Sequence, residues 1–451
     1  MFAFLLTAVA LAGSASGSAE VNLHLGTADC GLARVADCRL LDLRDLLVVG
    51  GRFDAEPTAG VGVRLEGVAR LHSVPDAGEV GDTADVLRVQ PLSLELPQAW
   101  IELREVFVPA LDLRLGQQRF AWGVGLGVNP VDVVNPYDLR DPARFDQRLG
   151  RPAVTARLHH QQATLELAWL PLFRPARMPA EIDLLEDAEA LFDFSEVGGG
   201  DLELGTLHTR TTFPDDRIGF QSFAARAAVA APVADLAVVF FHGRDSLPQV
   251  GGTAVLVGFP GGNRVDVGIP VLYPRMTLVG AEVRAPLVWE LGGWIEAAVT
   301  FPERVAVTAS RSQLEALVGL GAIEEVPDPL PETVLQDGQP LPRWVVGVDR
   351  LIGRFSLSLQ WIRGLPHERR VEDLSDYLAL GAVVTLSDPA QLRLTGLSDG
   401  RGWLLAGHLA LLHRDAATLT VGATLVDGPE ESTLSQLRRV SRVSLGVDVS
   451  F

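Results

Sequence analysis

The sequence predicts an all-β fold, a transmembrane antiparallel up-and-down β-barrel of about 16 strands, with a range of roughly 14 to 18. Three observations predict it. Successive segments alternate apolar and polar side chains with a period of two, as strands with one face of each kind do. Their connections alternate between short and long. The hydrophobic fraction is 47%, yet beyond the N-terminus no run of eighteen apolar residues occurs, so transmembrane helices are not expected.

The predicted strands recur along the whole chain. They cover residues 60–71, 97–107, 111–120, 152–160, 163–170, 218–229, 235–243, 276–284, 288–300, 343–351, 355–363, 377–387, 391–398, 402–413, 417–427 and 440–451. Short connections predict periplasmic turns and long ones predict extracellular loops, and only 399–401 is short where a long loop is due. The strand count changes if 45–53 forms a further strand. Residues 252–270 read as a hairpin that extends a loop, and 182–192 and 310–318 as helices within loops.

The last strand, 440–451, shows the alternation most clearly. In it Val443, Leu445, Val447, Val449 and Phe451 are apolar, and the residues between them are small or polar. At the end of a soluble sheet such a strand would be an open edge, whereas a closed barrel pairs it with the first strand. This end resembles the assembly signal of bacterial outer-membrane barrels, which typically finish in an aromatic residue. The resemblance implies the barrel-assembly machinery as a partner, with Phe451 as the signal.

The N-terminus predicts export. Residues 1–19 combine a short apolar run with small residues before a cleavage site after Ala19, which indicates a signal peptide, with a buried N-terminal helix as the alternative. Residues 20–58 are then expected to form a periplasmic segment, in which Cys30 and Cys38 predict a local disulfide. The barrel would occupy 59–451.

The charge excludes one class of partner. The formal net charge is −19 and the chain contains no Lys, which argues against binding nucleic acid. Residues 181–204 carry nine acidic side chains and no Arg. They read as a solvated loop or as a contact with lipopolysaccharide bridged by divalent cations. Outer-membrane lipid and lipopolysaccharide are the partners that this reading implies.

The most distinctive connection, 121–151, carries a repeated pattern of Asn and Asp. The loop motif consists of Trp122, Gly123, Asn129, Asp132, Asn135 and Asp138, with Pro after each Asn. Asn-Pro steps favour turns and an extended path. The carboxylates hydrogen-bond their own turns or bind a divalent cation; the spacing does not match an EF-hand, and no metal or other cofactor is assigned.

This block resembles a family of large bacterial outer-membrane barrels known mainly as a domain of unknown function. Its members carry a Gly-x-Gln strand end, then Trp-Gly, then two Asn-Pro-x-Asp steps, which match here at Gly116, Gln118, Trp122, Gly123, Asn129, Pro130, Asp132, Asn135, Pro136 and Asp138. The resemblance covers residues 111–180. It implies an outer-membrane barrel with a transport role, and it supplies no catalytic residues.

Catalytic motifs are missing from the sequence pattern. The Gly-rich stretch 123–127 lacks the Lys of a phosphate-binding loop. His159 and His160 are adjacent, so on a strand they point to opposite faces. We therefore expect no enzyme.

The polar faces of the predicted strands form the expected functional surface. Its pore-lining residues are Arg64, Glu66, Glu102, Arg104, Asp112, Arg114, Arg157, His159, Glu166 and Arg442. Mixed charges pair with one another or line a water-filled passage. The sequence thus predicts a channel or transporter for small solutes, narrowed by loop 121–151. The alternative is a non-transporting surface or envelope barrel, and either is compatible with a monomer or a homo-oligomer.

Overall fold

The computed structural model describes residues 13–26, 47–58, 60–71, 92–141, 144, 146–178, 203–213, 221–261, 264–319, 323–330, 332–413, 417–429 and 431–450. Several predictions lie outside this part of the chain. They concern Cys30, Cys38, Phe451, the predicted helix 182–192 and most of the acidic stretch 181–204.

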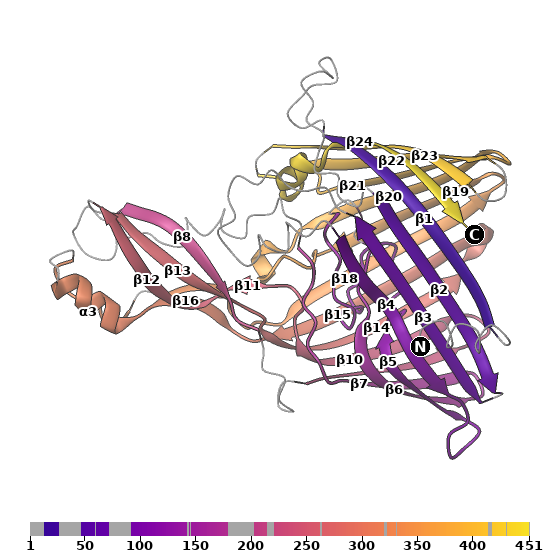
Figure 1. The fold of residues 1–451 in the computed structure, drawn as a ribbon, viewed down its shortest axis with the longest axis horizontal. Coiled ribbons are helices and arrows are strands. Elements are labelled where there is room, and N and C mark those ends of the chain that lie inside the picture. The colour runs from indigo at the N-terminus through magenta and orange to yellow at the C-terminus, as the bar shows by residue number, and fades with distance from the viewer. Residues whose placement is uncertain are drawn as a thin grey trace.

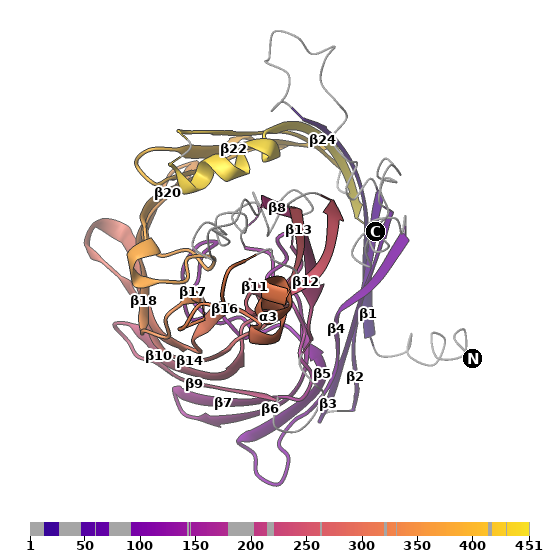
Figure 2. The same cartoon turned by 90° about the vertical axis from the view of Figure 1, so that its left-hand side faces the viewer.

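Eighteen strands close into one antiparallel barrel (Figures 1 and 2). They are β1 (Gly13–Gly26), β2 (Leu47–Thr58), β3 (Val61–Leu71), β4 (Leu92–Leu103), β5 (Leu111–Gln118), β6 (Arg151–His160), β7 (Ala163–Leu170), β9 (Ser222–Ala230), β10 (Asp235–Arg244), β14 (Arg275–Pro286), β15 (Leu291–Pro302), β18 (Leu341–Ile352), β19 (Phe355–Arg363), β20 (Asp376–Ser387), β21 (Ala390–Ser398), β22 (Trp403–His413), β23 (Ala417–Asp427) and β24 (Arg442–Ser450). Each pairs with the next, and β1 closes the ring on β24, with Val21 opposite Val447. No strand of the barrel wall is therefore left as an edge.

All sixteen predicted strands are present, and the predicted number is two short. The additional strands are β1 and β2, which lie in the barrel wall where the sequence suggested a periplasmic segment over 20–58. The expectation of a strand at 45–53 is confirmed by β2. The first half of β1 consists of Gly, Ala and Ser and therefore shows no apolar and polar alternation. The same composition is typical of the cleavage site of a signal peptide.

The predicted signal peptide overlaps the wall at residues 13–19, which pair with β2. Cleavage after Ala19 would leave residues 20–26, which keep their register with β24 from Asp448 to Arg442. The closing pair of strands would therefore survive processing, and the signal peptide stays a prediction.

The outer face of the wall is apolar on strand after strand. Large exposed side chains include Leu65, Ile101, Leu115, Leu167, Phe240, Val279, Ile295, Leu359, Leu380, Leu394, Leu405, Val421 and Leu445. Their neighbours in sequence point inward and are polar or buried, because successive strand residues face opposite sides. Such a band suits the lipid contact of an outer-membrane barrel. Among the described residues, no helix is long and apolar enough to span a membrane.

The two rims of the barrel differ as predicted. The C-terminal strand β24 ends at the rim of short turns, and the long connections leave the opposite rim (Figure 1). Three of them build a second sheet from β8 (Glu203–Thr211), β11 (Gln249–Val250), β12 (Gly252–Gly261), β13 (Arg264–Leu272), β16 (Val305–Ala309) and β17 (Glu332–Gln336). The hairpin expected at 252–270 is β12 and β13, and the helix expected at 310–318 is α3 (Arg311–Gly319). Seen along the axis, α3, β11, β16 and β17 lie within the outline of the ring (Figure 2).

Candidate functional site: a loop bound to the inner wall

The connection between β5 and β6 runs across the lumen and binds the wall on β15. Glu296 is fully buried, while its neighbours Ile295 and Ala297 face outward. Its Oε2 accepts hydrogen bonds from the N–H groups of Val124 and Gly125 at 2.8 and 3.2 Å, and its Oε1 accepts one from Val131 at 2.8 Å. One carboxylate thus satisfies three main-chain donors of a loop that would otherwise be buried without partners.

Gln360 on β19 provides a second attachment. Its Oε1 accepts the N–H of Leu126 at 2.7 Å, and its Nε2 donates to the carbonyl of the same residue at 2.8 Å. The indole N–H of Trp294 donates to Gln360 Oε1 at 3.2 Å and holds the amide in this orientation. Both main-chain polar groups of Leu126 are therefore hydrogen-bonded to the wall, as they would be in a strand.

Apolar contacts fix the body of the loop. Phe120 and Trp122 meet edge to face with their ring centres 5.5 Å apart, and Val131 and Val134 are fully buried. These side chains belong to one cluster with inward-facing residues of the wall: Ala153, Ala168, Leu170, Ala224, Val239, Phe241, Met276, Leu278 and Ala298. The small residues on the inner face leave room for the loop. The lumen is consequently filled on the side of β6 to β15.

Two residues of the loop motif, Asn135 and Gly123, determine the local path of the loop. Asn135 is fully buried; its Oδ1 accepts the N–H of Phe120 at 2.8 Å and its Nδ2 donates to the carbonyl of Phe120 at 2.7 Å and to Asp132 Oδ1 at 2.6 Å. Gly123 has φ +91° and a Cβ there would lie 2.9 Å from Asn129, so a side chain is excluded. The motif therefore fixes a compact loop.

The two motif carboxylates pair with arginines. Asp132 lies 3.4 Å from Arg148, and Asp138 accepts two hydrogen bonds from Arg140 at 2.6 and 2.8 Å. Burial raises the pKa of Asp132 to about 6, although Arg148 opposes the shift. Within the described residues no group of three His, Cys, Asp or Glu side chains is placed to hold a metal.

The predicted pore-lining residues on β3 to β7 lie on the inner face as a chain of ion pairs and hydrogen bonds. Glu102 accepts from Arg114 at 2.5 Å and from Arg104 at 3.4 Å. The guanidinium carbons of Arg114 and Arg64 lie 4.2 and 5.1 Å from the ring centre of Trp100. Further partners follow the same wall: Arg64 with Asp54 (2.6 Å), Glu66 with Gln98 (3.0 Å), Arg157 with Glu166 (3.4 Å) and His159 with Asp112 (3.4 Å). The structure therefore brings nine of the ten predicted residues to one wall.

The tenth, Arg442 on β24, is not part of this chain of pairs. It binds Asp141 of the β5–β6 connection at 2.5 Å. The loop is therefore also linked to the last strand. A second cluster joins the loop to β4, where Glu95 accepts from Arg177 and Arg140 and lies 3.5 Å from Arg70.

Sequence reasoning missed Glu296, Gln360 and the partly buried ion pair of Arg226 and Glu282, whose Nε and Oε1 lie 2.6 Å apart. The available signal was a single charged residue within an otherwise uncharged strand, as in the stretch 291–302. Glu282 and Arg226 also line a cavity of about 230 Å³ next to Val124 of the loop. Space therefore adjoins the loop inside the barrel.

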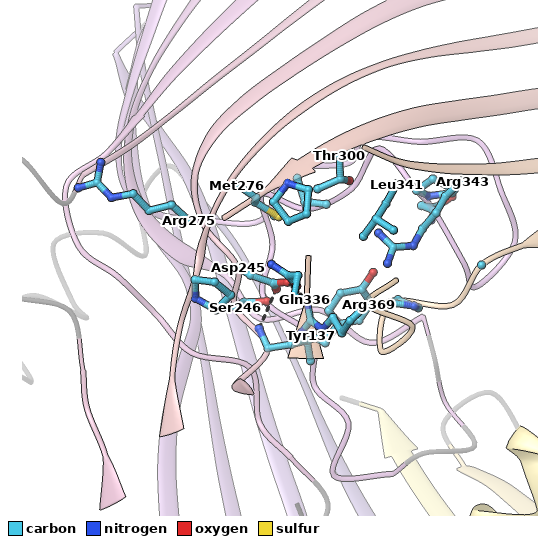
Figure 3. A pocket seen from close by; sticks show the side chains of 18 of the residues that line it. Tyr137, Asp245, Ser246, Arg275, Met276, Thr300, Gln336, Leu341, Arg343 and Arg369 are labelled. Atoms are coloured by element: carbon cyan, nitrogen blue, oxygen red, sulfur yellow. Dashed lines mark hydrogen bonds and ion pairs between the residues drawn. The ribbon is translucent and has the colours of Figure 1, made fainter. Parts of the chain in front are cut away.

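Another cavity, of about 40 Å³, lies between the loop and the rim of long connections (Figure 3). The loop contributes Val128, Pro130 and Tyr137, strand β18 contributes Arg343, and the long connections contribute Asp245 and Arg369. Asp245 and Arg369 form an ion pair.

Comparisons with known proteins agree on the fold. No family model and no curated protein matches the sequence, so the resemblance over residues 111–180 stays a prediction. Among solved structures, OccAB1 of Acinetobacter baumannii aligns with TM-score 0.50 and 8% identity over 97% of this chain and 96% of that one. OpdK of Pseudomonas aeruginosa, solved with vanillate, gives TM-score 0.48 and 8% identity over 97% and 98%. Wzi of Escherichia coli, a carbohydrate-binding β-barrel involved in capsule assembly, gives TM-score 0.44 and 8% identity over 100% of this chain and 87% of that one. The chain has the fold of porin-like outer-membrane β-barrels.

Proposed function

We propose that this barrel is a channel that passes small polar solutes along the charged wall and past a constriction made by loop 121–151. The observation that carries the proposal is the binding of this loop to Glu296 and Gln360 inside the lumen. A loop that crosses the lumen narrows the passage, and the paired charges on β3 to β7 give the remaining wall a transverse field for polar solutes.

The space next to the loop supports a route. The cavity beside Val124 is lined by Arg226 and Glu282, so charged side chains also lie on the inner wall next to the loop. Paired charges of opposite sign favour solutes with their own dipole over bulk ions of one sign.

Single-channel conductance of the purified, folded protein in a planar bilayer tests the proposal. We expect steady ohmic current, and a larger current when residues 124–140 are replaced by a short Gly-Ser linker. A correctly folded barrel that stays silent in both forms would exclude a channel. An unchanged current in the assembled deletion variant would exclude the loop as the constriction.

The alternative is a surface barrel that does not transport. The projecting sheet of β8, β11 to β13, β16 and β17 with α3 favours it, because this structure extends beyond the rim where a partner or saccharide could bind. A silent barrel whose surface binding is lost when α3 and β16 are removed would support this function instead. Lipopolysaccharide as a contact of the outer surface, and the assembly machinery as a partner of β24, stay proposals under either function.

A further inference from the structure

The cavity of about 230 Å³ next to Val124 is lined by a carboxylate that has one oxygen without a partner. Glu282 on β14 is 3% exposed. Its Oε1 accepts a hydrogen bond from Arg226 Nε at 2.6 Å, whereas its Oε2 accepts none within the described part of the chain. A buried carboxylate oxygen destabilises the fold unless a donor reaches it, and a guest in the cavity can supply that donor.

This cavity extends from the loop to the rim of short turns. Val124 of the loop lines it together with Ala230 and Asp235, which flank the short turn between β9 and β10. Asp235 also lines a second space, of about 450 Å³, between that turn and the turn from β14 to β15. The two spaces therefore adjoin at Asp235, on the side of the loop that faces the short turns.

The charges that line these two spaces favour a cation. Their carboxylates are Asp235, Glu282 and Glu290, and their guanidinium groups are Arg226 and Arg284. The lining therefore carries one more negative than positive charge, with both arginines counted against it.

Glu296 adds to this excess. It is fully buried and lies directly opposite Glu282 in the pairing of β14 with β15. Among the described residues it accepts hydrogen bonds only from main-chain N–H groups of the loop, so no guanidinium is paired with it. A water molecule in the cavity would satisfy Glu282 Oε2 but leave the excess charge in place, whereas a cation would do both.

The size and the apolar lining narrow the class of cation. By the usual volume per buried water, 230 Å³ holds about eight water-sized groups, which is more than one water or a bare metal ion fills. Ala228, Ala237 and Val124 add apolar contact for a short alkyl chain. A primary ammonium group has three N–H donors, so it can donate to Glu282 Oε2 and to a second acceptor.

We infer that this cavity binds small solutes that carry a primary ammonium group on a short alkyl chain. The ammonium group donates to Glu282 Oε2, and Asp235 attracts it where the cavity adjoins the space at the rim. The inference names small amines as a substrate class of the channel and rests on the proposed function for this role in transport. Binding itself does not depend on conduction.

Calorimetric titration of the full-length protein in a non-ionic detergent tests the site. The probes are n-butylamine, which is positively charged at neutral pH, and n-butanol, which has the same shape without the charge. We expect saturable binding of n-butylamine and none of n-butanol. E282Q should lower the affinity for n-butylamine by about tenfold or more, because a hydrogen bond between two charged groups is lost. E315Q, on the exposed face of α3, is the matched control and should bind as the wild type does.

A second variant keeps the test valid if E282Q does not fold, since that substitution leaves Arg226 without its partner. A228F keeps every charge and fills the cavity from β9, so it should abolish the binding of n-butylamine. Saturable binding to a barrel that stays silent in planar bilayers would overturn the channel but keep the site. A conducting barrel that binds neither probe, that binds both equally, or whose A228F variant binds as the wild type does would overturn the site and leave the channel standing.

Discussion

Glu296 and Val131 lie 165 positions apart, and the carboxylate of one accepts the N–H of the other at 2.8 Å inside the barrel. The same carboxylate accepts the N–H groups of Val124 and Gly125. A hydrogen bond within a folded protein contributes about 0.5 to 1.5 kcal/mol net, and more where the acceptor is charged. This one side chain therefore stabilises the loop against β15 together with the apolar cluster around Trp122 and Val134.

Replacing Glu296 by Ala should release the loop segment 124–131 from the wall. We expect larger and more variable single-channel currents, because three main-chain donors lose their acceptor and seek water instead. E315Q on the exposed helix α3 removes a carboxylate far from the barrel wall and should leave the currents unchanged. If E296A conducts as the wild type does, the apolar cluster around Trp122 and Val134 is enough to hold the loop.

The pair Glu102–Arg114 should control ion selectivity. E102Q leaves the charge of Arg114 uncompensated on the inner wall, whereas Arg104 keeps its ion pair with Glu56 at 2.8 Å, so the reversal potential in a KCl gradient should shift toward anion selectivity. R114Q should shift it in the opposite direction. E315Q serves again as the control for a lost charge. Reversal potentials that do not move in either variant would mean that ions do not pass this wall.

The strand alternation was enough to predict most of the wall. Because successive strand residues face opposite sides, the parity of one exposed residue such as Leu65 fixes the inward direction of Arg64 and Glu66. The alternation of short and long connections is also a local feature of the sequence, and it was enough to predict which strand ends lie at each rim. Strand β1 was not predicted, because its small residues show little alternation between apolar and polar side chains.

The attachment of the loop could not be predicted in the same way. Glu296 is the single charged residue of its strand, and its partners are main-chain N–H groups, which every sequence segment supplies. Which segment meets it depends on the order and register of the eighteen strands. The cavity of Arg343 and Gln336 likewise joins β18 and β17 to the loop only in three dimensions.

Acidification should stabilise the folded loop through Asp132. Burial raises the pKa of Asp132 to about 6 from 3.8, so the folded state binds more protons than the unfolded state between these values. Stability from this group therefore increases as the pH falls from above 6 toward 4, by up to about 3 kcal/mol for a shift of this size.

The variant D132N isolates this contribution. Its amide keeps an acceptor for Asn135 but does not titrate, so D132N should be more stable than the wild type at pH 7 and lose this advantage near pH 4. The quantity to compare is the difference in unfolding free energy between D132N and the wild type at each pH. Burial beside Arg369 and Arg343 lowers the pKa of His367 to about 4, so this histidine destabilises both proteins as the pH falls, and the effect cancels in the difference. Urea unfolding of both proteins in lipid vesicles at several pH values measures this difference. A difference that is constant with pH would contradict the prediction.

Leu394 and Thr395 are adjacent on β21 and should respond in opposite ways to the same substitution. Leu394 is 39% exposed on the outer face, whereas Thr395 shares the inward direction of the buried Leu397. Arg on the lipid face of a barrel costs about 2 to 4 kcal/mol near the middle of the membrane, whereas Arg on the lumen face meets water and other charges. L394R should therefore lower the free energy of unfolding in lipid vesicles by this amount, and T395R should change it little. Because the two variants add the same side chain one residue apart, equal costs would mean that the apolar face of β21 does not contact lipid.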